Sequence, residues 1–196
     1  HERLVGSEMC IRDSILNSLA AIAAAVTLGI DLDTAVMGIA GYSGVDRRFQ
    51  VKGVCSGFTI IDDYAHHPAE ITATLKAARH YPHKKLWCVF QPHTYTRTKA
   101  FLPEFAKALS LADHVILAKI YSAREADIYG VSSADIQRLI AKEGTPCEYF
   151  ESFPEIESFI KDNCKEGDVV ITMGAGNILE VGEDLLSPEL STVTAP

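Results

Sequence analysis

Short apolar runs alternate with longer amphipathic segments along most of this chain. The apolar runs predict strands over residues 50–54, 58–62, 86–91, 114–118, 148–150 and 168–173. The longer segments predict helices over 68–79, 99–109, 133–141, 153–164 and 178–186. Residues 87–90 and 169–172 are apolar on both faces, as strands covered by helices on both sides are. The pattern therefore predicts the α/β fold class, with a doubly wound, mostly parallel sheet.

Before the first strand, the spacing of apolar residues changes to that of helices. An Ala-rich stretch over 15–28 predicts a buried amphipathic helix. A second, short helix is expected over 33–39, with Asp33 as its cap and Gly41 at its end. These two helices precede the alternating pattern and predict a separate part of the chain.

Three segments lie outside these elements. Residues 1–14 have no helical or strand period that continues into the Ala-rich stretch, and we interpret them as a foreign start. Residues 41–49 are rich in turn formers and predict a linker that presents Arg47 and Arg48 to an anion. The tail after Ser187 is expected to be loose.

Composition and charge exclude several classes of function. Of the 196 residues, 47% are hydrophobic and 22% charged, which is typical of a soluble globular protein. The net charge of −8 and the lack of a basic run argue against a nucleic-acid partner. The most apolar stretch, 15–30, is interrupted by Asn17 and Ser18, so no membrane span is predicted. The 5 cysteines form no C-x-x-C pair, which favours a reducing, cytoplasmic location.

Polar side chains gather where three of the predicted strands end, and ligands of doubly wound sheets bind at such ends. The first cluster is the run Asp62-Asp63-Tyr64-Ala65-His66-His67-Pro68. A single histidine there would more often be structural, but five polar groups together favour a site. The cluster could also hold a metal, although adjacent residues such as His66 and His67 diverge too much to chelate easily. We therefore predict no metal site.

The second cluster lies in Gln91-Pro92-His93-Thr94-Tyr95-Thr96-Arg97-Thr98. Arg97 can hold a carboxylate with a bidentate fork, whereas a mere helix cap would need neither Arg97 nor His93. The third is Met173-Gly174-Ala175-Gly176-Asn177, which lacks the third glycine of a dinucleotide fingerprint. Its glycines either allow close packing or face a ligand. No G-x-x-x-x-G-K-[ST] loop occurs in the sequence, so an ATP triphosphate would be held outside this chain.

These motifs, in this order, resemble the C-terminal part of the Mur ligase family of peptidoglycan synthesis, and within it the alanine-adding branch. The resemblance covers residues 15–186 and also rests on Leu16-Asn17-Ser18-Leu19-Ala20-Ala21 and Gly44-Val45-Asp46-Arg47-Arg48-Phe49. It implies that 15–48 end a central ATP-binding domain and that 49–187 form a Rossmann-like C-terminal domain.

The resemblance also implies roles for single residues. Asn17 would contact adenine, Arg48 the ATP phosphates and Asp63 the ribose hydroxyls. The L-alanine pocket would consist of Tyr64, His66, His93 and Arg97. The implied catalytic residue is His66, although either histidine can orient the amine of alanine or take its proton.

The implied reaction uses ATP and Mg²⁺, whose ligands are expected outside this chain. ATP would phosphorylate the carboxylate of UDP-N-acetylmuramate, and the amine of L-alanine would then displace phosphate. Two departures from the family stand out: Asp13-Ser14 replace a His-Asn pair, and Thr94 stands where many members have Arg. The alternatives are a ligase for a recycled murein tripeptide, a non-catalytic Rossmann-like binding module and, least supported, a nicotinamide oxidoreductase. The sequence gives no oligomeric state.

Overall fold

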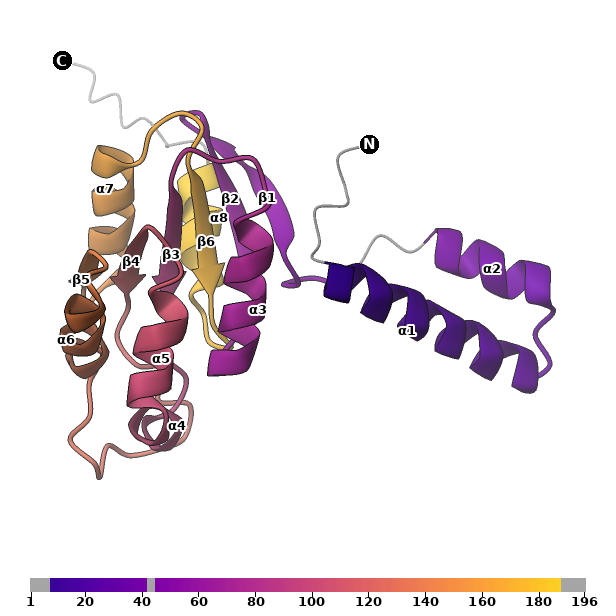
Figure 1. Cartoon of the computed structure of the whole chain (residues 1–196), viewed down its shortest axis with the longest axis horizontal. Helices are drawn as coiled ribbons and strands as arrows, with labels where there is room; N and C mark the ends of the chain where they lie inside the picture. Colours follow the sequence, from indigo (N-terminus) through magenta and orange to yellow (C-terminus); the bar gives the residue numbers. More distant parts are fainter. Residues whose placement is uncertain (1–7, 42–44, 188–196) are drawn as a thin grey trace, which may run out of the picture. The chain divides into compact units, whose positions relative to one another are not determined.

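The computed structural model describes residues 8–41 and 45–187 (Figure 1). It divides into two compact units, His1–Asp46 and Arg47–Pro196. The predicted loose tail, 188–196, lies outside the described residues. No helix in the described ranges combines the length and the hydropathy needed to cross a membrane.

The first unit is a pair of helices, α1 (Glu8–Thr27) and α2 (Leu32–Ala40), that pack against each other. The expected start of α1 at residue 15 was wrong, because the helix already begins seven residues earlier, within the segment interpreted as a foreign start. Each residue added to an existing helix gains one hydrogen bond at little cost, and no Gly or Pro interrupts this stretch. The cap of α2 is Asp31 rather than Asp33, since Asp31 Oδ1 accepts a hydrogen bond from Thr34 N at 3.0 Å.

The apolar side chains described in this unit, over 15–41 and 45–46, are mostly exposed, contrary to the expected buried helix. Ile15, Leu16 and Leu19 on α1 are each more than half exposed, and Ala35 on α2 is the buried residue among those described in this unit. Two packed helices bury only the stripe of residues along which they meet. Contact with α2 therefore leaves the other apolar residues of α1 exposed.

The second unit is a six-stranded sheet with helices on both faces, as the alternating pattern predicts (Figure 1). Its strands are β1 (Gln50–Cys55), β2 (Phe58–Asp63), β3 (Leu86–Phe90), β4 (His114–Leu117), β5 (Cys147–Tyr149) and β6 (Val169–Met173). Their order is β1-β2-β6-β3-β4-β5, and every neighbouring pair is parallel except β1 and β2. β1 and β2 form a hairpin through Ser56 and Gly57, both at positive φ, as two-residue hairpin turns require.

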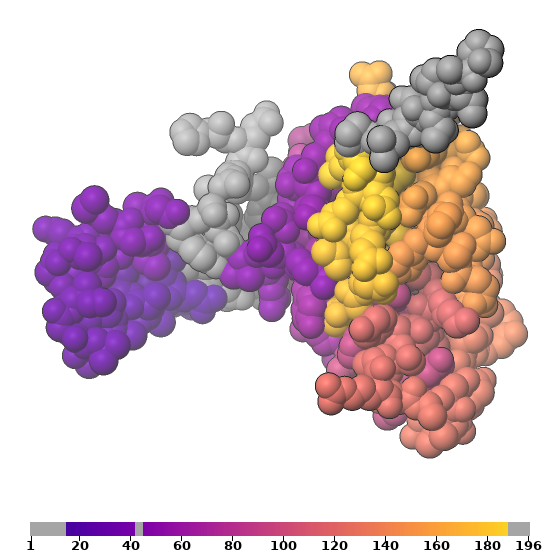
Figure 2. Space-filling model, turned by 180° about the vertical axis from the view of Figure 1, so that it is seen from behind, coloured from indigo at the N-terminus to yellow at the C-terminus, as the bar shows by residue number. Residues whose placement is uncertain are grey.

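Two apolar cores lie on opposite faces of the sheet. The helices of this unit are α3 (Pro68–Ala78), α4 (Tyr95–Ala100), α5 (Leu102–Leu109), α6 (Ser133–Glu143), α7 (Phe153–Asn163) and α8 (Leu179–Leu186). Buried residues of α3, α5 and α6 form one core, and those of α7 and α8 form the other. Figure 2 shows α8, in yellow, lying between β1 and α7 on the second face. Strand residues alternate between the two cores, which explains why β3 and β6 are apolar throughout.

One predicted helix is two helices in the structure. The segment expected over 99–109 begins at Tyr95 as α4, breaks at Phe101 and resumes as α5. Pro103 has no N–H to bond the carbonyl of Lys99, and its ring would collide with that carbonyl in a continuous helix. Because α4 begins at Tyr95, Arg97 lies on a helix and not on the loop that was expected before a helix.

Candidate functional site

The three clusters predicted from the sequence meet at the carboxyl end of the sheet, where β2, β6 and β3 finish side by side. Met173 at the end of β6 is paired with Asp63 on β2 and with Phe90 on β3. The chain leaves all three strands at this level, so the segments that begin at Tyr64, Gln91 and Gly174 start side by side. The carboxyl end of the sheet, where ligands of doubly wound sheets bind, is thus built from the predicted motifs.

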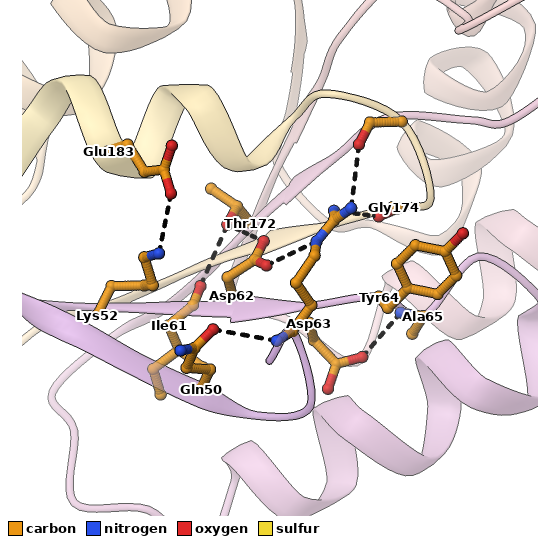
Figure 3. A network of polar contacts seen from close by, with 12 residues as sticks. Gln50, Lys52, Ile61, Asp62, Asp63, Tyr64, Ala65, Thr172, Gly174 and Glu183 are labelled. Atoms are coloured by element: carbon orange, nitrogen blue, oxygen red, sulfur yellow. Dashed lines mark hydrogen bonds and ion pairs between the residues drawn. The ribbon is translucent and has the colours of Figure 1, made fainter. Parts of the chain in front are cut away.

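Arg47, the first residue of this unit, binds several groups at the carboxyl end of the sheet. Its Nε lies 2.9 Å from Oδ2 of Asp62, and its other nitrogens donate to the carbonyls of Gly176 (3.2 Å) and Gly174 (2.6 Å). Asp62 is 1% exposed, and its Oδ1 accepts a hydrogen bond from Thr172 at 2.8 Å (Figure 3). The expectation that Arg47 is presented to an external anion was therefore wrong, because its guanidinium pairs with the Asp62 carboxylate within the protein.

Asp63 organises the turn that follows β2. Its Oδ2 accepts from Phe49 N at 2.8 Å, and its Oδ1 accepts from Ala65 N at 2.8 Å and from Thr74 Oγ1 at 3.2 Å. Burial raises the pKa of this carboxyl, and these hydrogen bonds oppose that shift. Asp63 is 6% exposed, so a ribose hydroxyl would have to use the lone pairs that remain.

The residues after Asp63 turn two imidazoles in different directions. His67 caps α3, where its Nδ1 accepts from Ala69 N and Glu70 completes a capping box. His66 has Nδ1 3.0 Å from the carbonyl oxygen of Tyr64 and 3.5 Å from a carboxylate oxygen of Glu70. Both neighbours of Nδ1 are acceptors, so Nδ1 of His66 bears the proton in the neutral ring and Nε2 has the free lone pair.

His93 and Arg97 lie together beyond β3. Nη1 of Arg97 is 3.4 Å from Nδ1 of His93, and the ring of His93 stacks on Tyr121 with centroids 5.6 Å apart. Thr94 caps α4 with the unusual φ of 66°, and its N–H donates to the carbonyl of Tyr121 at 2.8 Å. Among the residues that the structure describes, no carboxylate lies within 4 Å of the Arg97 guanidinium.

The two histidine clusters converge at this point. The ring centroids of His66 and His93 are 6.1 Å apart, and those of His66 and Tyr64 are 5.4 Å apart. Partial burial lowers the pKa of His93, and the charges of Arg97 and His66 lower it further. A cluster of two imidazoles and a guanidinium that has no carboxylate partner among the described residues suits a small molecule with both a carboxylate and an amine.

The glycines after β6 serve close packing. At Gly174 φ is 151°, and a Cβ would lie 2.8 Å from the carbonyl oxygen of Gln91. A Cβ at Gly176 would lie 2.8 Å from Cγ of Tyr121 and would collide with the side chain of Gln91. Of the two interpretations left open by the sequence, the tight turn with close packing explains both glycines.

Two residues predicted for the nucleotide have exposed side chains. Arg48 is exposed beside the turn that holds Asp63, and its charge lowers the pKa of that carboxyl. Asn17 is exposed on α1, in the other unit. The nucleotide contacts of Arg48, Asn17 and Asp63 stay predictions. Within 15–41 and 45–187, no three His, Cys, Asp or Glu side chains are grouped to hold a metal ion.

Sequence reasoning missed Tyr121 and Glu125 in this site. Both residues follow β4. Ligands of doubly wound sheets bind at the carboxyl ends of the strands, so the end of β4 is a candidate position just as the ends of β2, β3 and β6 are. Glu125 Oε2 accepts a hydrogen bond from Thr96 N at 2.9 Å, and no motif in the sequence indicates that pairing.

Known proteins resemble both the sequence and the fold. A family model described as "Mur ligase, glutamate ligase domain" matches residues 47–176. The UDP-N-acetylmuramate–L-alanine ligase of Agathobacter rectalis is 58% identical over 173 residues, which cover 88% of this chain and 38% of that protein. The chain thus spans less than two fifths of the length of the curated relatives that it matches.

Solved structures show the same relationship. The UDP-N-acetylmuramate–alanine ligase of Thermotoga maritima is 31% identical with a TM-score of 0.69, over 88% of this chain and 36% of that one. A murein peptide ligase of Psychrobacter arcticus is 26% identical with a TM-score of 0.67, over the same shares. With a family model that covers most of its second unit and with these relatives, the chain belongs to the Mur ligase family.

Proposed function

We propose that this chain provides the L-alanine site and part of the nucleotide site of an ATP-dependent ligase that joins L-alanine to UDP-N-acetylmuramate in peptidoglycan synthesis. The proposal rests above all on Arg97, a half-buried guanidinium without a carboxylate partner among the described residues, set beside two imidazoles. The names of the relatives support alanine as the amino acid.

The chemistry of alanine matches the groups of this cluster. Its carboxylate would bind the planar fork of Arg97, which can donate two parallel hydrogen bonds. Its methyl group offers little apolar area, so the affinity must come from its charged ends. We expect Tyr64, with its ring against His66, to form the wall beside the methyl group.

The two imidazoles differ in what they offer the amine. Nε2 of neutral His66 is an acceptor, because the carbonyl of Tyr64 holds the proton on Nδ1. At His93 the donor Arg97 faces Nδ1, which leaves the proton on Nε2. We propose that His66 takes the proton of the attacking amine while His93 orients a substrate oxygen.

The bond changes are those of acyl transfer. The nitrogen of alanine forms a bond to the muramyl carbonyl carbon, the bond from that carbon to the phosphate oxygen breaks, and phosphate leaves with its electron pair. ATP supplies the phosphoryl group that makes the carboxylate reactive. Arg48 would contact the phosphates and Asn17 the adenine, whereas the phosphate loop and the Mg²⁺ ligands would lie outside this chain. We place this reaction in the cytoplasm, with no nucleic-acid or membrane partner.

A chimera tests the proposal directly. The 173-residue segment of this chain that aligns with the A. rectalis ligase replaces the matching segment of that enzyme. Phosphate release and product mass are measured with ATP, Mg²⁺, UDP-N-acetylmuramate and L-alanine, glycine or a murein tripeptide. Turnover that depends on L-alanine and yields the alanyl product supports the proposal.

The other results identify the alternatives. Turnover with the tripeptide but not with alanine would establish the tripeptide ligase. Binding of alanine or ATP without any turnover, in a chimera that unfolds as cooperatively as its parent, would favour a non-catalytic binding module.

A further inference from the structure

The loop between β4 and α6 is joined to the segment that bears His93. Tyr121 N donates to the carbonyl of Pro92 at 2.9 Å, and the carbonyl of Tyr121 accepts from Thr94 N at 2.8 Å. Together with the stacked rings of His93 and Tyr121, these bonds form a short parallel bridge outside the main sheet. The position of the His93 segment therefore depends on this loop.

The same loop reaches the first turn of α4 through Glu125. A turn closed by the hydrogen bond from Glu125 N to the carbonyl of Ser122, at 2.9 Å, sets the direction of this side chain. Its Oε2 accepts from Thr96 N at 2.9 Å, and hydrogen bonding to Thr96 lowers the pKa of the Glu125 carboxyl. Glu125 is thus charged at neutral pH and satisfies a donor of α4 that has no partner within the helix.

α4 needs such an anchor more than other helices of the sheet unit do. It has 6 residues, too few for a helix to be stable by its own hydrogen bonds. It also starts from Thr94, whose left-handed φ of 66° is costly for a β-branched residue. Arg97 lies on this turn, directly after Thr96, so any shift of the turn moves its guanidinium.

We infer that Glu125 is a positioning residue that holds the first turn of α4 so that the Arg97 fork meets the carboxylate of the amino-acid substrate. This inference rests on the proposed function, because it takes the amino acid as the ligand of Arg97. Glu125 itself is half-buried and contacts the first turn of α4 rather than His66 or Tyr64. Its loss should therefore affect the binding of the amino acid far more than the stability of the fold.

Two substitutions in the same chimera with the A. rectalis ligase separate the hydrogen bond from the charge. Glu125→Ala removes the acceptor for Thr96 N, and we expect the KM for L-alanine to rise about fivefold while kcat and the KM for ATP change less than about twofold. Glu125→Gln keeps an oxygen acceptor and should restore the KM for alanine to within about twofold. Glu143→Ala, at an exposed acid at the end of α6, is the matched control and should change none of these values.

A second measurement needs no ligation. Amide hydrogen exchange at Thr96 in the 196-residue chain should be faster with Glu125→Ala, and close to that of the parent with Glu125→Gln. If the parent chimera shows no alanine-dependent turnover, the proposed function fails, and the exchange rates alone decide whether Glu125 anchors the turn. An unchanged exchange rate at Thr96, or KM values for alanine and ATP that rise together, would overturn the inference.

Discussion

The guanidinium of Arg47 and the carboxylate of Asp62 form an ion pair, with Nε and Oδ2 2.9 Å apart, at the carboxyl edge of the sheet. The side chain of Asp62 is 2% exposed and that of Arg47 is 19% exposed, so solvent screens the pair weakly. The same guanidinium binds the carbonyls of Gly174 and Gly176, and its carbon lies 4.9 Å from the ring centre of Tyr64. One arginine thereby fixes the turn after β6 relative to β2.

Arg47→Ala should lower the free energy of unfolding of the second unit by about 3 kcal/mol, because it leaves the Asp62 carboxylate buried without its cation. Urea unfolding followed by the fluorescence of Trp87, the single tryptophan, reports on this unit. The matched control is Lys52→Ala, which breaks the more exposed pair with Glu183. That control should cost less than about 1 kcal/mol. Equal losses in the two variants would show that Arg47 is a surface charge after all.

The sequence was sufficient to predict the sheet and most of its helices, because apolar period and turn residues are local signals. Strands such as β3 and β6 were located to within a residue or two. The strand order was not predicted, since β6 enters between β2 and β3 through contacts between residues far apart in the chain. The break at Phe101 could have been inferred from Pro103 alone.

The placement of the predicted clusters was foreseeable for the same reason. Because ligands bind at the carboxyl ends of the strands, the clusters of His66 and His93 were expected at the same end of the sheet. In the structure the ring centroids of the two histidines are 6.1 Å apart. The prediction for Arg47 failed because its acceptors include two backbone carbonyls about 130 residues further along the chain, which no side-chain motif can reveal. The specific roles of Arg48, Asp63 and Arg97 toward ligands stay predictions.

The pKa of His93 should rise when the charge of Arg97 is removed. Burial lowers this pKa from 6.5, Arg97 and His66 lower it further, and Glu125 opposes them. Because the folded-state pKa lies below the unfolded one, His93 contributes stability that is lost as the pH falls below about 6.5. An NMR titration of the His93 ring in the 196-residue chain should therefore show a higher pKa in Arg97→Gln than in the parent. Arg138→Gln, which removes an exposed partner of Asp135, should leave it unchanged. An equal or lower pKa in Arg97→Gln would contradict the geometry.

Gly176→Ala should destabilise the second unit and also shift the ring of His93. The added Cβ would collide with Gln91 and lie 2.8 Å from Cγ of Tyr121, so both side chains must move, at a cost of about 2 kcal/mol. Gly144→Ala is the control, because it introduces backbone strain at φ 83° in open space and should cost about 1 kcal/mol. Trp87 fluorescence in urea measures both variants. The ring resonances of His93 should shift in Gly176→Ala alone, since Tyr121 stacks on that ring.

Arg97→Ala, in the chimera with the A. rectalis ligase, should raise the KM for L-alanine far more than that for ATP. A lost charged contact to a carboxylate costs about 2 kcal/mol, which corresponds to about a 30-fold increase. Arg97→Lys keeps the charge but not the planar fork, so its KM should fall between those of the parent and Arg97→Ala. Arg138→Ala, on the exposed face of α6, should match the parent. Steady-state kinetics with each substrate varied in turn give all the values. If the KM values for alanine and ATP rose equally, Arg97 would act on the closure or folding of the enzyme rather than on the amino acid. The carboxylate of alanine would then need another partner.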